Sequence, residues 1–125
     1  MIHLLLASAG GAIGAGLRFL IGSFMFRALG PSFPWATLFV NIVGSLAMGL
    51  LIGILARRGG TPNELRIFLA TGILGGFTTF SAFSLDAISL WERGEVWAAA
   101  LYVLGSVVLS ILALFVGLMA VRSFA

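Results

Sequence analysis

A run of glycine and hydroxyl residues in the third apolar segment is the part of this chain best suited to binding an ion. The run extends from Gly72 to Ser84 and reads GILGGFTTFSAFS. Adjacent glycines and clustered threonines and serines make a poor helix. A broken helix at membrane depth frees carbonyl and N–H groups, which can become ion ligands. We therefore expect a break near Gly75–Thr79; the alternative is a continuous, slightly strained helix.

Two phenylalanines follow this run and could contribute to an anion site. Phe80 and Phe83 are three residues apart on one helical face, which Asp86 continues. Phenylalanines in a membrane helix usually only pack, and the chain has 11 of them. However, the edge of an aromatic ring is electropositive. Ring edges beside hydroxyl donors would suit a small anion.

Two further apolar segments carry polar stripes with a spacing of four residues. Side chains with this spacing share one helical face, and here the two stripes consist of Thr37, Asn41 and Ser45 and of Tyr102, Ser106 and Ser110. Asn41 offers two N–H donors and one acceptor. Such groups either bond to a neighbouring helix, or to their own backbone, or line an ion pathway. Spacing alone leaves these alternatives open.

The first apolar segment combines glycines with one buried charge. Gly10, Gly14, Arg18 and Gly22 recur every four residues and share a face. The glycines predict close packing against another helix. A guanidinium at the depth of Arg18 must pair, reach the membrane surface, or face water.

The elements that must position these residues are four long apolar segments. They span about 3–26, 35–56, 65–91 and 96–121, separated by short Gly-, Pro- or charge-rich turns. Of the 125 residues, 61% are hydrophobic and 9% are charged, whereas soluble domains carry about 25% charged residues. About 20 apolar residues cross a bilayer as a helix. We predict an all-α membrane protein with one domain over 1–125 and four transmembrane helices, the lipid bilayer being its solvent.

Charge distribution restricts the partners and the assembly. All seven basic residues are arginines scattered singly or in one pair, which does not fit nucleic acid. The two sides of the membrane differ little in arginine count, so the positive-inside rule sets only a weak orientation. Four short helices also enclose little volume. We therefore expect an antiparallel homodimer. No catalytic constellation is present, so we do not expect an enzyme.

Three motifs resemble those of the small bacterial fluoride channels, the CrcB or Fluc family. GGAIGAGLRF from Gly10 to Phe19 resembles the motif of their first helix, and TLFVNIVGS from Thr37 to Ser45 that of their second. The run from Gly72 to Ser84 is similar to their signature in the third. The three occur in order in a four-helix chain, and the resemblance covers essentially all of it.

The resemblance implies a dual-topology antiparallel homodimer with two fluoride pores and a structural sodium ion at its centre. The backbone carbonyls of Gly75 and Thr78 would hold the sodium, which agrees with the preference of hard cations for oxygen ligands. Arg18 would lie in a vestibule. The fluoride pathway would be lined by Asn41, Thr79, Phe80, Ser81, Phe83, Tyr102, Ser106 and Ser110.

The function that the resemblance implies is passive fluoride export. Fluoride enters cells as HF, is trapped as the anion, and would leave through the inner membrane of a bacterium, driven by the membrane potential. One alternative is a small multidrug exporter, which needs a membrane-embedded carboxylate; Asp86 is the one candidate. A non-transporting assembly factor is another alternative, although it would not need aligned donors on three helices.

Overall fold

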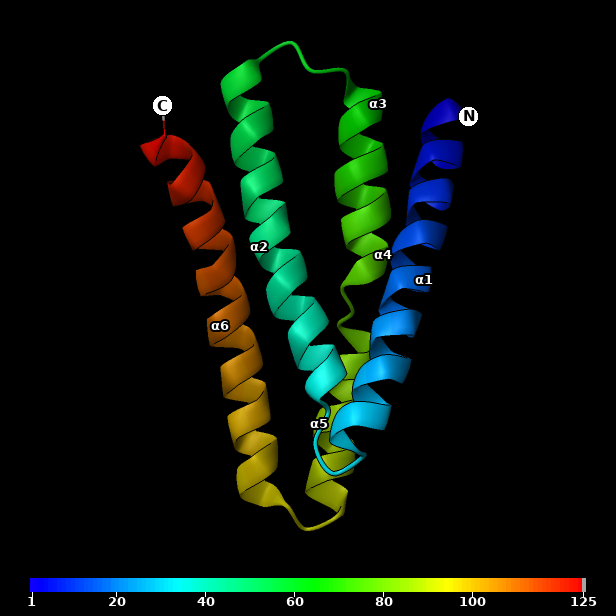
Figure 1. Ribbon diagram of the computed structural model, residues 1–125, viewed down its shortest axis with the longest axis vertical. Helices are drawn as coiled ribbons and strands as arrows, with labels where there is room; N and C mark the ends of the chain where they lie inside the picture. Colours follow the sequence, from blue (N-terminus) through cyan, green and yellow to red (C-terminus); the bar gives the residue numbers. More distant parts are fainter. Residues whose placement is uncertain (125) are drawn as a thin grey trace.

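Four helical passes form the fold in a computed structural model that describes residues 1–124 (Figure 1). They are α1 (Ile2–Leu29), α2 (Trp35–Arg58), a segmented third pass (Asn63–Glu92) and α6 (Val96–Ser123). Each pass is long and apolar enough to cross a membrane, which confirms the prediction of four such helices in an all-α chain. Both termini and the α2–α3 connection lie at one end, because four passes return the chain to its starting side.

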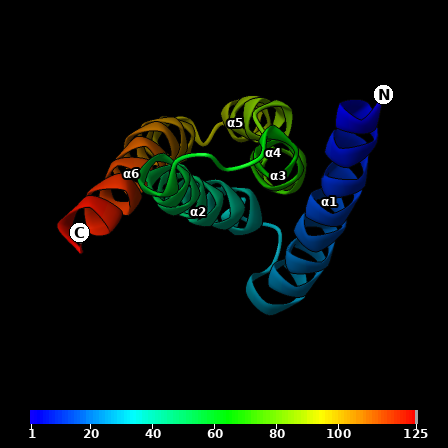
Figure 2. The ribbon, with the colours of Figure 1, turned by 90° about the horizontal axis from the view of Figure 1, so that it is seen from above.

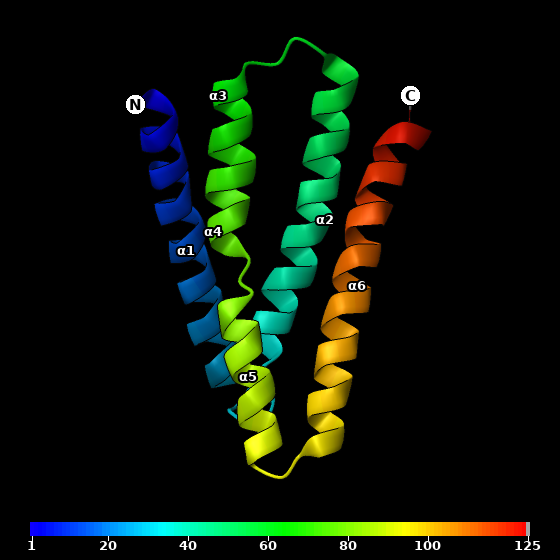
Figure 3. The same ribbon diagram turned by 180° about the vertical axis from the view of Figure 1, so that it is seen from behind.

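The third pass consists of four pieces. It begins with α3 (Asn63–Arg66), continues as the π-helix η1 (Ile67–Leu74) and the short α4 (Gly75–Phe77), and resumes as α5 (Ser81–Glu92). Between α4 and α5 the backbone is non-helical, and Thr78 is extended with φ −87° and ψ 160°. A thin, bent coil joins α4 to α5 at this point when the chain is seen from behind (Figure 3).

The predicted break at Gly75–Thr79 is wrong for its first three residues. Gly75 is helical, with φ −64° and ψ −37°, and the helix ends only after Phe77. Gly76 serves packing, because a Cβ there would lie 2.6 Å from the carbonyl oxygen of Gly11. The backbone leaves the helix at Thr78–Phe80 instead, where a side chain from α2 replaces helical hydrogen bonds.

Glycines allow two close helix pairs. In the first pair, α1 packs against η1, and a Cβ on Gly10 would lie 2.8 Å from the Cα of Gly72. In the second pair, α2 packs against α6, and a Cβ on Gly117 would lie 2.6 Å from the carbonyl oxygen of Leu46. Small residues permit such backbone contact between membrane helices.

The break changes the partner of the third pass. Before it, η1 and α4 contact α1; after it, α5 contacts α6. Seen from above, α5 is displaced from α3 and α4 towards α6 (Figure 2). A small core of buried side chains forms at this end of the bundle, consisting of Phe83, Leu90, Ala99 and Tyr102. Elsewhere large apolar side chains point outward, as a lipid solvent requires.

Candidate functional site: a polar groove at the helix break

The side chain of Asn41 holds the break open. Its Nδ2 donates to the carbonyl oxygen of Thr79 at 2.9 Å, and its Oδ1 accepts from the Thr79 N–H at 2.8 Å. In a continuous helix that N–H would donate to the carbonyl of Gly75. Asn41 therefore substitutes for backbone partners, and it also lines the groove described below.

Other side chains satisfy part of the remaining backbone. Arg18 Nε donates to the carbonyl oxygen of Gly76 at 3.2 Å, so this guanidinium has a backbone partner at depth. The N–H of Ala82 donates to Thr79 Oγ1 at 3.2 Å rather than to the carbonyl of Thr78, its partner in a regular helix. The carbonyls of Gly75 and Thr78 have thus both lost their helical donors.

A groove of about 520 Å³ runs past the break. It lies between α2, the break and α6, and most of the residues predicted for ion binding line it. These are Asn41, Gly75, Thr78, Thr79, Phe80, Phe83, Ser106 and Ser110. Residues from three separate helical passes thus converge on one space.

The two phenylalanines differ in environment. Phe83 is buried at 7% exposure, whereas Phe80 is 77% exposed. Their ring centroids are 5.4 Å apart, with the ring planes inclined by 53°. Phe83 also packs against Tyr102, at a centroid distance of 5.3 Å. One ring is therefore fixed by the core, and the other stands free at the edge of the groove.

The hydroxyls of α6 face this groove without partners. Neither Ser106 Oγ nor Ser110 Oγ has a hydrogen-bond partner among the described residues, although both atoms are buried. Serine hydroxyls in helices commonly bond to a carbonyl one turn earlier, and here they do not. A buried unsatisfied hydroxyl costs about 1–3 kcal/mol. Both donors are thus available to a ligand in the groove.

Three predicted residues lie outside the groove. Tyr102 is 1% exposed, and its hydroxyl donates to Asp86 Oδ2 at 3.1 Å. Ser81 is exposed at the start of α5, with its Oγ 3.5 Å from Thr79 Oγ1. Arg18 lines a neighbouring groove of about 590 Å³ between α1 and α2, together with Thr37 and Thr79. The two grooves meet at Thr79, which lines both.

Comparison with known proteins decides the family. Residues 5–118 match the family described as CrcB-like protein, Camphor Resistance (CrcB). The chain belongs to the CrcB family. As a family member with four helices suited to crossing a bilayer, it is a multi-pass membrane protein.

Curated CrcB relatives cover nearly all of the chain. The fluoride-specific ion channel FluC of Chelativorans sp. (strain BNC1) is 62% identical over 98% of both chains. The protein of the same name from Mesorhizobium japonicum is 59% identical over 98% of both chains. That of Agrobacterium fabrum is 56% identical over 94% of both. These names describe ion channels rather than enzymes, and they favour the channel interpretation over an exporter of drugs.

Sequence reasoning missed two features of this CrcB chain. The pairing of Asn41 with Thr79 could have been suspected from the sequence, because Asn41 is an amide within one apolar segment and a break was expected in another. The contact between Tyr102 and Asp86 has a weaker basis in the sequence, since Asp86 continues the helical face of Phe80 and Phe83. Among the described residues, no three His, Cys, Asp or Glu side chains cluster to hold a metal.

Proposed function

We propose that this chain is a fluoride channel that lets the anion leave the cell passively and so protects against fluoride toxicity. The groove with two unpaired buried hydroxyls is the observation that carries the proposal. It agrees with the printed name of the CrcB relatives, fluoride-specific ion channel FluC. We place the protein in the inner membrane of a bacterium, where the potential is worth about 2.3 kcal/mol per charge per 100 mV.

Each group in the groove has a role in replacing the water of a small anion. Ser106 and Ser110 supply two O–H donors without breaking any hydrogen bond of the described structure. Phe80 and Phe83 supply electropositive ring edges. The second N–H of Asn41 Nδ2 is a further donor, because the structure assigns Nδ2 one acceptor, the Thr79 carbonyl. Fluoride would therefore pass from donor to donor without entering hydrocarbon.

The direct test is fluoride efflux from liposomes that contain the purified protein. Vesicles loaded with potassium fluoride and treated with a potassium ionophore should release fluoride far faster than protein-free vesicles. Chloride-loaded vesicles serve as the matched control and should release little. Absence of fluoride release from vesicles with verified, folded protein would reject the proposal.

We propose in addition that the working unit is an antiparallel homodimer. Phe80 is 77% exposed although it stands beside the groove, and the groove opens to the protein surface. A second copy related by a two-fold axis in the membrane plane would cover both. Reporters fused to the C-terminus should give signal on both sides of the membrane. Signal on one side alone would contradict this arrangement.

We also propose a structural sodium ion bound by the carbonyl oxygens of Gly75 and Thr78. Both carbonyls have lost their helical donors, and Gly75 and Thr78 both line the groove. Oxygen atoms are the ligands that hard cations prefer. Two antiparallel copies would contribute four such oxygens. A bound sodium would supply a fixed positive charge near the path of the anion.

The sodium proposal is tested by exchanging sodium for a large organic cation during purification. We expect the dimer to melt at lower temperature and fluoride flux to fall, with both restored when sodium is added back. Gly75→Pro should abolish the response, because proline distorts the backbone. An unchanged melting temperature after verified removal of sodium would contradict the proposal.

A further inference from the structure

A pocket at the α2–α3 end of the molecule lies apart from the polar groove and shares no lining residue with it. It has a volume of about 510 Å³ and lies between α2, the α2–α3 connection and the start of the third pass. Figure 1 shows α2 and α3 diverging towards this connection. The pocket is therefore open to the membrane surface and separate from the proposed path of the anion.

Two helical faces form the walls of this pocket. The lining side chains of α2 are Leu51, Ile54, Leu55 and Arg58, whose spacing places them on one face, and those of the third pass include Leu65 and Leu69. Ile54 and Leu65 are 45% and 44% exposed. From Leu51 to Arg58 the face of α2 extends about 10 Å along the helix axis. The pocket is thus an apolar slot that enters the hydrocarbon, with a guanidinium at its outer end.

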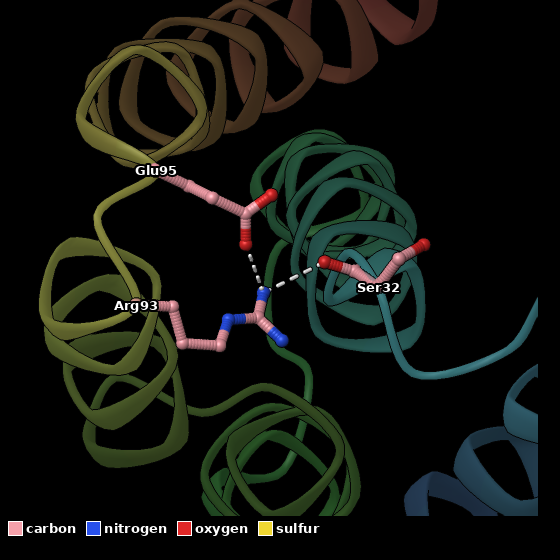
Figure 4. A network of polar contacts seen from close by, with 3 residues as sticks. All are labelled: Ser32, Arg93 and Glu95. Carbon is pink, nitrogen blue, oxygen red and sulfur yellow. Dashed lines mark hydrogen bonds and ion pairs between the residues drawn. The ribbon is translucent and has the colours of Figure 1, made fainter.

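Arg58 is the one charged side chain among the described residues that line the pocket. Within residues 1–124 no hydrogen bond or ion pair engages it, whereas Arg57 donates to two carbonyl oxygens near the end of α6. Arg93, at the opposite end of the molecule, is also engaged. Its Nη2 donates to the carbonyl oxygen of Ser32 at 2.8 Å and lies 2.9 Å from Glu95 Oε2 (Figure 4). The donors of Arg58 are therefore available to an anionic group from outside the chain.

The two ends of the molecule also differ in charge. The charged side chains at the α2–α3 end are those of Arg57, Arg58, Arg66, Arg122 and Glu64. At the other end Arg27 and Arg93 are balanced by Glu92 and Glu95. Basic pockets between membrane helices bind anionic lipid headgroups, and a guanidinium can form two parallel hydrogen bonds with a phosphate. The charge of the α2–α3 end is thus complementary to an anionic lipid.

We infer that this pocket binds one anionic phospholipid, with its phosphate on Arg58 and an acyl chain along the apolar faces of α2 and the third pass. The inference goes beyond the proposed function and does not depend on it. A soluble anion would gain nothing from the apolar slot, and the headgroup amine of a zwitterionic lipid offsets its phosphate. The lipid joins the α2–α6 pair to the α1–η1 pair, because the pocket lies between them.

The test is native mass spectrometry of the full chain, purified with equal amounts of phosphatidylglycerol and phosphatidylcholine that have identical acyl chains. We expect the wild-type protein to retain phosphatidylglycerol about fivefold better, the factor that one arginine near a headgroup provides. Arg58→Gln keeps an amide donor but loses the charge, and it should lose this preference. Arg66→Gln removes the same charge at the same end but outside the pocket, so this matched control should keep the preference.

A second pair of variants tests the apolar slot. Leu65→Trp fills part of the slot and leaves Arg58 in place, so it should reduce the retention of both lipids. Leu101→Trp adds the same bulk at a position on α6 that is 68% exposed and outside this pocket, and it should retain lipid as the wild type does. Melting temperatures measured without added lipid establish that each variant is folded.

Four results would overturn the inference. The first is equal retention of the two lipids by the wild-type protein. The second is an equal loss of preference in Arg58→Gln and Arg66→Gln, because diffuse charge would then attract the lipid. The third is displacement of the lipid by inorganic phosphate, which has no acyl chain. The fourth is lipid on single chains but never on dimers, because a second copy would then cover the pocket.

Discussion

Asn41 and Thr79 form a closed pair across two helices: the amide accepts the Thr79 N–H at 2.8 Å and donates to the Thr79 carbonyl at 2.9 Å. An asparagine side chain thus gives one residue of an interrupted helix both of its backbone partners. Unsatisfied backbone groups cost several kcal/mol each in hydrocarbon. The break consequently depends on a side chain 38 residues away along the chain.

Replacing Asn41 by Asp should destabilise the break and impair transport. The carboxylate can still accept from the Thr79 N–H, but it cannot donate to the Thr79 carbonyl when ionised, and it repels an anion. We expect a loss of about 1–3 kcal/mol of stability, measured by thermal melting in detergent, together with strongly reduced fluoride efflux. Ser45→Ala, one turn along the same stripe, is the control for stability. An Asn41→Asp variant that melts like wild type would show that the pair contributes little.

A methyl group at Gly14 should separate α1 from η1. A Cβ there would overlap the carbonyl oxygen of Ile73, whereas a Cβ at Gly16 would meet nothing within 4 Å. Gly14→Ala should therefore cost about 1–3 kcal/mol through overpacking, and Gly16→Ala should be neutral or slightly stabilising. Melting temperatures of the two variants provide the comparison. Equal melting temperatures would argue against close packing at Gly14.

The two phenylalanines should respond differently to isoleucine. Phe83→Ile removes a ring from the core and should lower both stability and fluoride efflux. Phe80→Ile removes a 77% exposed ring and should reduce efflux with a smaller effect on stability. Isoleucine keeps apolar bulk but has no electropositive edge. Phe24→Ile, which faces outward from α1, is the control. Normal efflux in both variants would show that the rings only pack.

Removing the unpaired hydroxyls should separate transport from stability. In Ser106→Ala and Ser110→Ala the groove loses a donor, but no hydrogen bond of the described structure is broken. We expect unchanged or slightly higher melting temperatures and clearly reduced efflux, because dehydrated fluoride would lose a partner. Ser84→Ala, whose hydroxyl bonds to the Phe80 carbonyl, serves as the comparison. If both α6 variants carried fluoride at the wild-type rate, these hydroxyls would lie off the path.

The sequence predicts the four passes and the polar face of each helix because both depend on local patterns. Apolar length identifies a membrane-spanning helix, and a spacing of four places Ser106 and Ser110 on one face. The break is harder to locate, since glycines serve two purposes. Gly76 is present for close contact with Gly11, while the interruption two residues later depends on Asn41.

Other features depend on tertiary contacts that periodicity does not contain. Tyr102 shares a stripe with Ser106, yet its longer side chain reaches Asp86 on the neighbouring helix instead of the groove. Arg93 lies in a charge-rich turn, and its contact with Ser32 joins two loops 61 residues apart in sequence. The roles in transport assigned to the groove residues stay predictions until the variants are measured.

The interruption in the third pass also bears on how the protein is made. Its side-chain partners, Asn41 and Arg18, belong to α2 and α1. If the third pass enters the bilayer before it meets those helices, no side chain is present to bond to the Thr79 backbone. In that state only a continuous helix satisfies the Thr79 N–H and carbonyl groups. We therefore expect the 30-residue span to insert unbroken and to unwind only as the helices associate. The broken shape of the backbone is then a product of assembly, acquired after insertion rather than during it.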